Sequence, residues 1–373
     1  MPRRPASIAA TLLLPALLTA CGASQPAPPP PPSAEALAAI APQPGADRAA
    51  LARATDALFT RNDVGGTRAL LVLHDGEVVA SRYAEGFGPG SRFIGWSMSK
   101  TVTAVLIGLL VADGRLALDA PPPIDLWQRA GDPRGEITLR QLLQMRSGLR
   151  HQEKADPVYE SAEVRMLFLD GRDDMAAWAE AQPLEHEPGS TFAYSTPTSV
   201  ILSDIAARVL APDGSPEQRQ QAVAAFLRTR LAQPLGMGSM VAEFDRAGTM
   251  LGGSMIHATA PDWARFGEFL RARGVARGTQ VVPRGWVALM REPSPAAPDY
   301  GLATWLNRPS GGERAMLFAD QGPADAFALI GHLGQYVIVA PGRRLTVVRL
   351  GKTDGEDRAA LVEALAGIVA AYE

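Results

Sequence analysis

The sequence predicts a mixed α/β fold of the α+β kind, in which one antiparallel sheet is built from both ends of the globular part. Residues 69–73 and 77–80 are apolar strand patterns on either side of Asp75-Gly76, a dipeptide typical of tight hairpin turns. Further strand patterns occur near the C-terminus, whereas helix patterns fill roughly residues 115–250. We therefore expect strands from both ends to share one sheet flanked by helices, with a helical lobe inserted between them.

Three apolar runs near the C-terminus complete the predicted sheet. They cover residues 327–330, 335–340 and 345–350, and Pro341-Gly342 marks the turn between the last two. No internal repeat accompanies them.

Capping residues mark the predicted helices. Thr138 can cap a helix that runs to about residue 145, and Ser215-Pro216-Glu217-Gln218 combines a capping box with proline in the first turn. Thr259 can open another helix, and residues 356–372 have the apolar face of a final one.

Composition narrows the functional classes. The chain has 373 residues, of which 47% are hydrophobic and 20% charged, so most of it has enough apolar material for a core. Its formal net charge of -3 gives no electrostatic reason to expect nucleic acid as a partner. The single cysteine excludes an intramolecular disulfide and a thiolate cluster, and the five histidines form no HxH or HExxH pair. We expect no metal and no other cofactor.

Residues 1–20 are typical of an export signal. Two arginines precede a short apolar stretch, residues 8–18, that is well short of the ~20 residues needed for a spanning helix. The tetrapeptide Leu18-Thr19-Ala20-Cys21 resembles the lipobox of bacterial lipoproteins, which are cut before the cysteine and acylated on its sulfur. An ordinary secretory signal with an incidental cysteine is the alternative.

Residues 21–45 predict a spacer between a lipid and the globular domain, residues 46–373. The spacer is rich in Pro, Ala and Ser and includes the run Pro28–Pro32, which favours extended polyproline II. Gly22 resembles the pattern sorted to the outer membrane of Gram-negative bacteria. We therefore expect a bacterial cell-envelope protein that faces the periplasm and meets the membrane only through a lipid on Cys21.

Ser97 and Lys100 form the strongest chemical signal. They stand three residues apart at the start of the apolar run Thr101–Ala112, which is too short to span a membrane and predicts a buried core helix. One helical turn would place both on the same face, where the amine could take the hydroxyl proton. Burial and the helix N-terminus would both lower the pKa of Lys100.

The alternative is that Ser97 only caps the helix and that Lys100 reaches back to solvent. Lysine usage weighs against it, because only three of the 36 basic residues are lysines, at positions 100, 154 and 352. The chain uses arginine for nearly all of its cations, yet it has an amine here. An amine can lose its proton inside a protein, whereas a guanidinium cannot.

Several segments together resemble the serine β-lactamase and penicillin-binding protein superfamily. They follow in order as Ser97-x-x-Lys100, Leu142–Leu149, Glu187–Ser195, Thr259–Gly267 and Gly331–Gln335. The resemblance spans roughly residues 60–355 and points to the branch related to class C β-lactamases, with its esterases and 6-aminohexanoate-dimer hydrolases. It implies the β-lactamase-like fold.

The resemblance also implies catalytic roles. Ser97 would be the nucleophile, and Lys100 the amine that helps to deprotonate it. Tyr194 would relay the proton as general base and then acid, for which nearby cations would need to lower its pKa. Taken without the motif, Tyr194 could equally be a core tyrosine with a satisfied hydroxyl.

A third motif, Gly331–Gln335, is implied to lie beside the nucleophile. The backbone amides of Ser97 and Gln335 would form the oxyanion hole, and Gly334 would let the substrate approach the strand. His332 would contact the substrate or simply pack.

Two positions depart from the β-lactamase pattern. Tyr194-Ser195-Thr196 lacks the asparagine of Tyr-x-Asn, and His332 replaces the lysine that meets the antibiotic carboxylate. A neutral imidazole holds an anion more weakly than an ammonium. Efficient β-lactam turnover is therefore not expected.

We predict a lipid-anchored serine hydrolase that cleaves a small amide or ester through an acyl-enzyme, nearest in kind to the 6-aminohexanoate-dimer hydrolases. One alternative is a β-lactamase or D-amino-acid peptidase that acts on cell-wall material. Another is a non-catalytic envelope lipoprotein that binds peptidoglycan or a partner. Ser97, Lys100 and Tyr194 together argue against the last, because binding alone requires none of them.

Overall fold

The structure is a computed structural model that describes residues 1–2 and 30–373. The chain divides into two units, residues 1–31 and 32–373, and every helix and strand of the described residues lies in the second. The expected export signal, Cys21 and the first part of the expected spacer lie outside the described residues.

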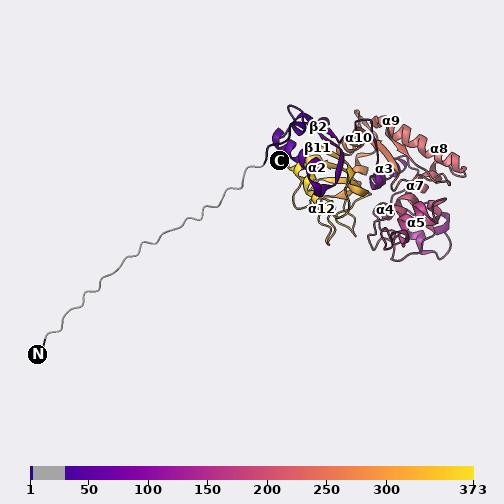
Figure 1. The fold of residues 1–373 in the computed structure, drawn as a ribbon. Helices are drawn as coiled ribbons and strands as arrows, with labels where there is room; N and C mark the ends of the chain where they lie inside the picture. Colours follow the sequence, from indigo (N-terminus) through magenta and orange to yellow (C-terminus); the bar gives the residue numbers. More distant parts are fainter. Residues whose placement is uncertain (3–29) are drawn as a thin grey trace. The chain divides into compact units, whose positions relative to one another are not determined.

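Strands of the second unit are concentrated toward its two ends, and an unbroken series of helices occupies residues 99–235 between them (Figure 1). The helices are α1 (Ala34–Ala39), α2 (Arg48–Thr60), α3 (Ser99–Ala112), α4 (Leu139–Leu143), α5 (Ala162–Phe168), α6 (Met175–Glu180), α7 (Thr196–Leu210), α8 (Pro216–Leu227), α9 (Gln233–Leu235), α10 (Ala260–Arg271), α11 (Arg284–Met290) and α12 (Arg358–Ala370). The strands are β1 (Gly66–His74), β2 (Glu77–Tyr83), β3 (Arg92–Ile94), β4 (Val241–Ala242), β5 (Ile256–Thr259), β6 (Val275–Ala276), β7 (Thr279–Gln280), β8 (Trp305–Leu306), β9 (Phe327–Gly331), β10 (Gln335–Ala340) and β11 (Leu345–Lys352).

The central sheet has six antiparallel strands in the order β2-β1-β11-β10-β9-β8. Strands from both ends of the domain therefore lie side by side, as predicted. The predicted hairpin is confirmed, because β1 and β2 join through Asp75 and Gly76, whose φ values are 53° and 85°. Positive φ at both positions is what a two-residue type I′ turn requires.

Both faces of this sheet are buried. In β1, Ala69 and Leu71 belong to the core shared with α3 and α10, whereas Leu70 and Val72 belong to a second core shared with α2 and α12. Because successive side chains point to opposite faces, a strand covered on both sides must be apolar at nearly every position. This explains why the strands read as continuous apolar runs.

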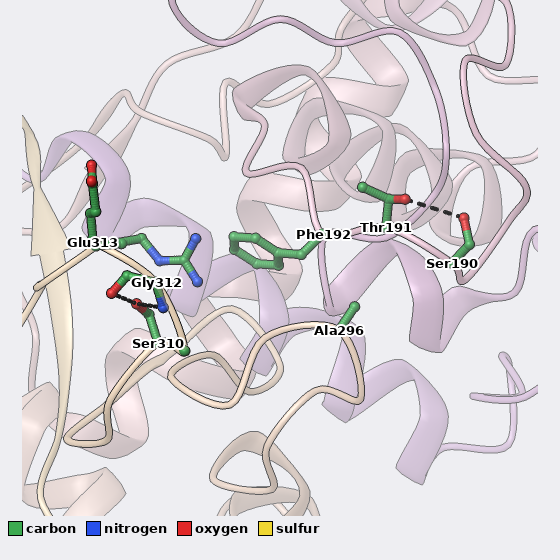
Figure 2. A pocket seen from close by; sticks show the side chains of 9 residues that line it. Ser190, Thr191, Phe192, Ala296, Ser310, Gly312 and Glu313 are labelled. Atoms are coloured by element: carbon green, nitrogen blue, oxygen red, sulfur yellow. Dashed lines mark hydrogen bonds between the residues drawn. The ribbon is translucent and has the colours of Figure 1, made fainter.

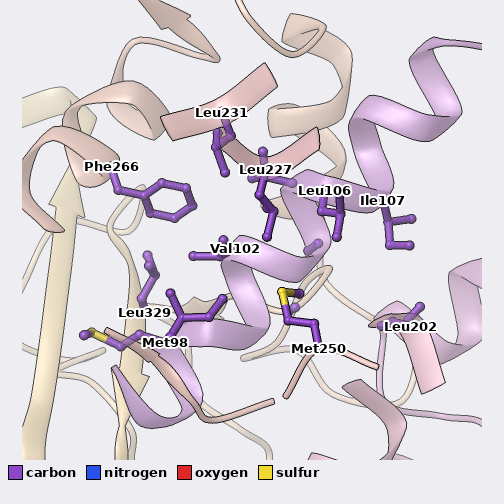
Figure 3. Packing of buried hydrophobic residues seen from close by; sticks show 14 of the residues in the cluster. Met98, Val102, Leu106, Ile107, Leu202, Leu227, Leu231, Met250, Phe266 and Leu329 are labelled. Atoms are coloured by element: carbon purple, nitrogen blue, oxygen red, sulfur yellow. The ribbon is translucent and has the colours of Figure 1, made fainter. Parts of the chain in front are cut away.

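Helix α3 is buried almost all round, which confirms the predicted core helix. Figure 3 shows Val102 and Leu106 among Leu227 of α8, Phe266 of α10 and Leu329 of β9. A helix enclosed by neighbours on all sides needs no polar face. The site described below lies at the N-terminal end of this helix.

The predicted capping residues are confirmed. Thr138 and Ser215 form capping boxes at α4 and α8, and the Thr259 side chain caps α10. Helix α4 ends at Leu143, earlier than predicted, and the chain then turns with a positive φ of 55° at Met145.

The expected spacer is wrong at its C-terminal end. Ser33 caps α1, Ala36 of that helix has no exposed surface, and Ile40 forms a β-bridge with Ala80. Ala36, Leu37 and Ile40 pack on the second core, so this segment does not continue the extended spacer.

Candidate active site

Ser97 lies in a short 3₁₀ turn, η2 (Trp96–Met98), that leads into α3. Close packing fixes the turn: Gly95 N–H donates to Ile256 O over 2.8 Å, and a Cβ on Gly95 would overlap the Trp263 ring. Trp96 has a φ of +47°, a conformation that costs about 1–2 kcal/mol for a residue with a side chain. The surrounding contacts therefore hold Ser97, half-buried, at the head of α3.

The amine of Lys100 contacts Ser97 directly. Lys100 Nζ lies 3.0 Å from Ser97 Oγ, 2.8 Å from Thr196 Oγ1 and 2.9 Å from Gly253 O. The side chain is 2% exposed, and burial lowers its pKa although two nearby carboxylates act in the opposite direction. The predicted direction of the pKa shift is confirmed, and the alternative in which Lys100 reaches solvent is wrong.

Thr196 links this amine to a carboxylate. Glu153 Oε2 accepts the Thr196 N–H over 2.7 Å, and Glu153 Oε1 lies 2.6 Å from Thr196 Oγ1. Glu163 Oε1 lies further away, at 3.5 Å from the same hydroxyl. Burial and the charge of Glu153 raise the pKa of Glu163 to about 7. The amine therefore has two carboxylates nearby.

Tyr194 stands beside the same amine. Lys100 Nζ lies 4.9 Å from the centroid of the Tyr194 ring. The rings of Trp305 and Tyr300 pack on Tyr194 with centroid separations of 5.3 and 5.9 Å. Ser97, Lys100 and Tyr194, which the sequence grouped by motif, are thus brought together in space.

The expectation that cations lower the pKa of Tyr194 is wrong. Burial raises it, and the charge of Glu153 adds to the increase. A hydrogen bond with Ser97 and the more distant Arg358 oppose the shift without reversing it. The phenol of Tyr194 therefore holds its proton and is suited to donate it.

The turn between β9 and β10 lies against η2, the turn that carries Ser97. A Cβ on Gly331 would come within 2.3 Å of Gly95 O, and the rings of His332 and Trp96 meet edge to face with centroids 5.4 Å apart. The Gln335 side chain is turned inward, where its Nε2 donates to Gly351 O over 2.8 Å. The third motif is thus beside Ser97, and the oxyanion role of the Gln335 amide stays a prediction.

Backbone conformation and contacts within the protein explain why position 334 is a glycine. Gly334 has a φ of +77°, and a Cβ there would meet Leu361 and Arg349. Arg349 is fully buried and donates to Gly334 O over 2.8 Å and to Thr67 Oγ1 over 3.0 Å. Burial lowers the pKa of Arg349 to about 10. A contact between Gly334 and the substrate stays a prediction.

His332 is exposed at the edge of this turn. Partial burial and the positive charges of Arg358 and Lys154 lower its pKa, although Asp354 acts in the opposite direction. The imidazole is therefore neutral at pH 7. Whether it contacts the substrate stays a prediction.

A cavity of about 450 Å³ lies beside the aromatic cluster that packs on Tyr194. Phe192 lines it and packs on Trp305, and Figure 2 shows Phe192 projecting toward the loop that carries Ser310 and Gly312. The Arg314 guanidinium lies 4.7 Å from the centroid of the Phe192 ring. None of these residues was predicted as part of a site.

Four residues that contact Lys100 or Thr196, or are themselves Thr196, were not predicted from the sequence. They are Glu153, Glu163, Thr196 and Gly253. Thr196 had a signal, because it occupies the asparagine position of the second motif and carries a hydroxyl. The two glutamates follow no pattern, and a backbone carbonyl has no sequence signature.

Two absences apply to residues 1–2 and 30–373. Among them no group of three or more His, Cys, Asp or Glu side chains is placed to hold a metal ion. Nor does any helix in that part of the chain combine the length and apolar character needed to cross a membrane.

The fold and the site together define a protein of the β-lactamase-like class. The family model described as Beta-lactamase matches residues 51–371, so the chain belongs to this family. The mixed α/β arrangement with an antiparallel sheet is the β-lactamase-like fold that the sequence predicted.

A curated relative and several solved structures resemble the chain. The 6-aminohexanoate-dimer hydrolase of Paenarthrobacter ureafaciens is 27% identical over an aligned length of 236 residues. The match covers 59% of this chain and just over half, 56%, of that protein. A Bacillus anthracis structure provisionally assigned to the same hydrolase is 20% identical, with a TM-score of 0.68, over 85% of this chain and 81% of that one. A family VIII carboxylesterase is 19% identical, with a TM-score of 0.61, over 87% and 97% of the two chains.

A buried histidine holds the second motif in place. His151 is 4% exposed, its Nε2 donates to Ala179 O over 3.0 Å, and its Nδ1 lies 3.1 Å from the hydroxyl of Ser195, the N-cap of α7. Because a carbonyl only accepts, the neutral tautomer carries its hydrogen on Nε2 and accepts the Ser195 hydroxyl at Nδ1. Burial lowers the pKa of His151 to about 4.

This histidine makes a testable contribution to the pH dependence of stability. Below the unfolded pKa of about 6.5 the unfolded chain binds a proton at His151 that the folded chain does not, so the free energy of unfolding falls by roughly 3 kcal/mol as the pH drops to about 4. We expect His151→Gln to be less stable at pH 8 and to lose less stability between pH 6.5 and 4. Urea unfolding of both proteins at pH 8, 6.5 and 4 measures these free energies. Equal losses of stability in the two proteins between pH 6.5 and 4 would contradict the expectation.

Proposed function

We propose that the chain is a serine hydrolase that cleaves a small amide or ester through an acyl-enzyme. The observation that carries the proposal is the buried Lys100 amine, 3.0 Å from Ser97 Oγ, with a lowered pKa. A hydroxyl becomes a nucleophile when a neighbouring base takes its proton, and a desolvated amine is such a base. A binding protein would have no need for this pair.

In the proposed acylation, Ser97 Oγ forms a bond to the substrate carbonyl carbon while its proton passes to Lys100 Nζ. The negative charge that develops on the carbonyl oxygen is stabilised by the backbone amides of Ser97 and Gln335. Tyr194, whose raised pKa keeps its proton, donates that proton to the leaving nitrogen or oxygen as its bond to carbon breaks. Lys100 then returns a proton to Tyr194.

In the proposed deacylation, water attacks the carbonyl carbon of the acyl-enzyme. Its proton passes to the network of Tyr194 and Lys100, the bond to Ser97 Oγ breaks, and the serine regains its proton. The proposed cycle uses the side chains of Ser97, Lys100 and Tyr194, the two backbone amides and water. His332 and Gly334 are proposed to lie beside the bound substrate at the edge of the site.

For the substrate, we favour the linear amides and esters cleaved by relatives named 6-aminohexanoate-dimer hydrolase and carboxylesterase. A neutral His332 supports this choice over a β-lactam, whose carboxylate is better held by a permanent cation. The cavity beside Phe192 is a candidate site for one end of a linear substrate.

The initial rate of p-nitrophenyl butyrate hydrolysis tests the proposal. We expect Ser97→Ala to lose at least about 10³-fold and Lys100→Met at least about 10²-fold, because one removes the nucleophile and the other its base. Lys352→Met, which changes an exposed lysine at the end of β11, is the matched control and should keep the natural rate. Equal rates for the natural protein and Ser97→Ala would contradict the proposal, and covalent labelling by penicillin with β-lactam turnover would favour a β-lactamase instead.

We further propose that the protein is lipid-anchored through Cys21 in the bacterial cell envelope, at the outer membrane and facing the periplasm. The tetrapeptide Leu18-Thr19-Ala20-Cys21 and the proline-rich segment after it support this proposal. Acyl chains contribute roughly 0.8 kcal/mol per buried CH₂, so two or more attach a protein firmly to a membrane.

Fractionation of a Gram-negative host tests the anchor. We expect the natural chain to sediment with membranes and to incorporate radiolabelled palmitate, because both depend on the Cys21 sulfur. Cys21→Ser should lose the label and leave the membrane fraction. The same distribution and labelling for both chains would exclude the anchor.

A further inference from the structure

The hydrogen atoms available around Lys100 restrict how its amine can be oriented. Gly253 O, 2.9 Å from Nζ, is a carbonyl and can only accept. One hydrogen of a neutral amine therefore points to Gly253. A neutral amine has one more hydrogen and one lone pair, and two hydroxyls remain as its partners: Ser97 Oγ at 3.0 Å and Thr196 Oγ1 at 2.8 Å. Which hydroxyl receives the lone pair decides whether Lys100 can act as a base toward Ser97.

Glu153 decides this through Thr196. The Thr196 hydroxyl has a single hydrogen, and Glu153 Oε1 lies only 2.6 Å away. An ionised carboxylate can only accept, so the hydroxyl donates to Glu153. Thr196 Oγ1 must then accept from Lys100, which uses the second hydrogen of the amine. The lone pair is left for Ser97 Oγ.

The surroundings of Glu153 favour a role as acceptor for both of its oxygens. Its Oε2 accepts the Thr196 N–H over 2.7 Å at the first turn of α7, where the positive end of the helix dipole favours an anion. Glu163, whose pKa is raised to about 7, is the neighbouring carboxylate that takes up a proton. A proton taken up by Glu163 leaves both oxygens of Glu153 as acceptors for Thr196.

We propose that Glu153 is a positioning residue which, through the hydroxyl of Thr196, turns the lone pair of Lys100 onto Ser97 Oγ. The inference rests on the proposed serine hydrolase function and assigns a role to Glu153, which lies outside the three motifs, and to Thr196 in the second. Thr196 thereby fills the position of the asparagine that the sequence lacks, with a hydroxyl whose direction is set by the carboxylate behind it.

Replacing the carboxylate by an amide would reverse the hydrogen bonds. In Glu153→Gln, Oε1 must accept the fixed Thr196 N–H, so Nε2 donates to Thr196 Oγ1. The Thr196 hydrogen then turns toward the lone pair of Lys100 and occupies it.

The charged and titratable groups around this network are Glu153, Glu163, Lys154, Tyr194 and Arg358. Of these, the two glutamates raise the pKa of Lys100.

The rate at which an alkyl fluorophosphonate labels Ser97, measured from pH 5 to 10 on the full chain, tests the inference. Labelling forms the bond from Ser97 Oγ to phosphorus, releases fluoride and passes the serine proton to Lys100, so its rate rises with pH as the amine becomes neutral. In Glu153→Gln we expect the maximum rate to fall at least about tenfold, because the lone pair is occupied. The rising limb should also move to lower pH, because the charge that raises the pKa of Lys100 is gone.

Matched variants separate this role from a structural one. Glu163→Gln removes a neighbouring charge without touching the close hydrogen bonds of Thr196, so its rising limb should move while its maximum rate falls less than that of Glu153→Gln. Thr196→Val should lose the same factor as Glu153→Gln, and Thr196→Ser, which keeps the hydroxyl, should recover it. A structural defect alone would lower the rate in all four variants without moving the rising limb.

The outcomes distinguish this inference from the function on which it rests. Equal labelling of the natural chain and Ser97→Ala would remove the proposed function and the inference together. Ser97-dependent labelling, with a natural maximum rate and an unmoved rising limb in Glu153→Gln, would overturn the inference alone. Loss of rate in Thr196→Ser as large as in Thr196→Val would also overturn it.

Discussion

The site depends on placing one amine where water cannot reach it. Helix α3 packs on the sheet and on the helices of the inserted lobe, so the Lys100 side chain has no route to solvent and must find its partners within the protein. An unpaired ammonium in such surroundings is costly, and a neutral amine with satisfied hydrogen bonds is not. The burial of the helix therefore also lowers the pKa of Lys100, as its proposed role as a base requires.

The partners of that amine come from separate parts of the chain. Ser97 precedes α3, Thr196 begins α7, and Gly253 lies just before β5. The sheet contributes the turn between β9 and β10, which lies against the turn that carries Ser97 and accepts a hydrogen bond from Arg349 at Gly334 O. The surroundings of the amine therefore depend on how η2, α7 and the segment before β5 pack together.

Local chemistry made much of the fold predictable. The Asp75-Gly76 turn, the capping residues Thr138 and Ser215 and the apolar strand runs each act within a few residues, so the sequence alone revealed them. The packed helix α1 was missed because six residues, most of them alanine, do not stand out beside a proline-rich segment.

The site was predictable only where its groups are close in sequence or follow a known motif. Spacing brought Ser97 and Lys100 together, and the motif added Tyr194. The direction of the Tyr194 pKa was wrong because it depends on burial and on Glu153, a carboxylate from a distant loop. The same loop supplies the acceptor behind Thr196, which no local pattern could have indicated.

The state of the Lys100 amine is the central claim, and the composition allows it to be measured directly. With lysines only at 100, 154 and 352, protein labelled with ¹³C-lysine should give three resolved Cε signals, and loss of one in Lys100→Met assigns it. We predict that the Lys100 signal titrates at a pH below the ordinary lysine value of about 10.4. Three signals that titrate together near that value would show that Lys100 stays an ammonium at neutral pH, and would contradict its role as a base.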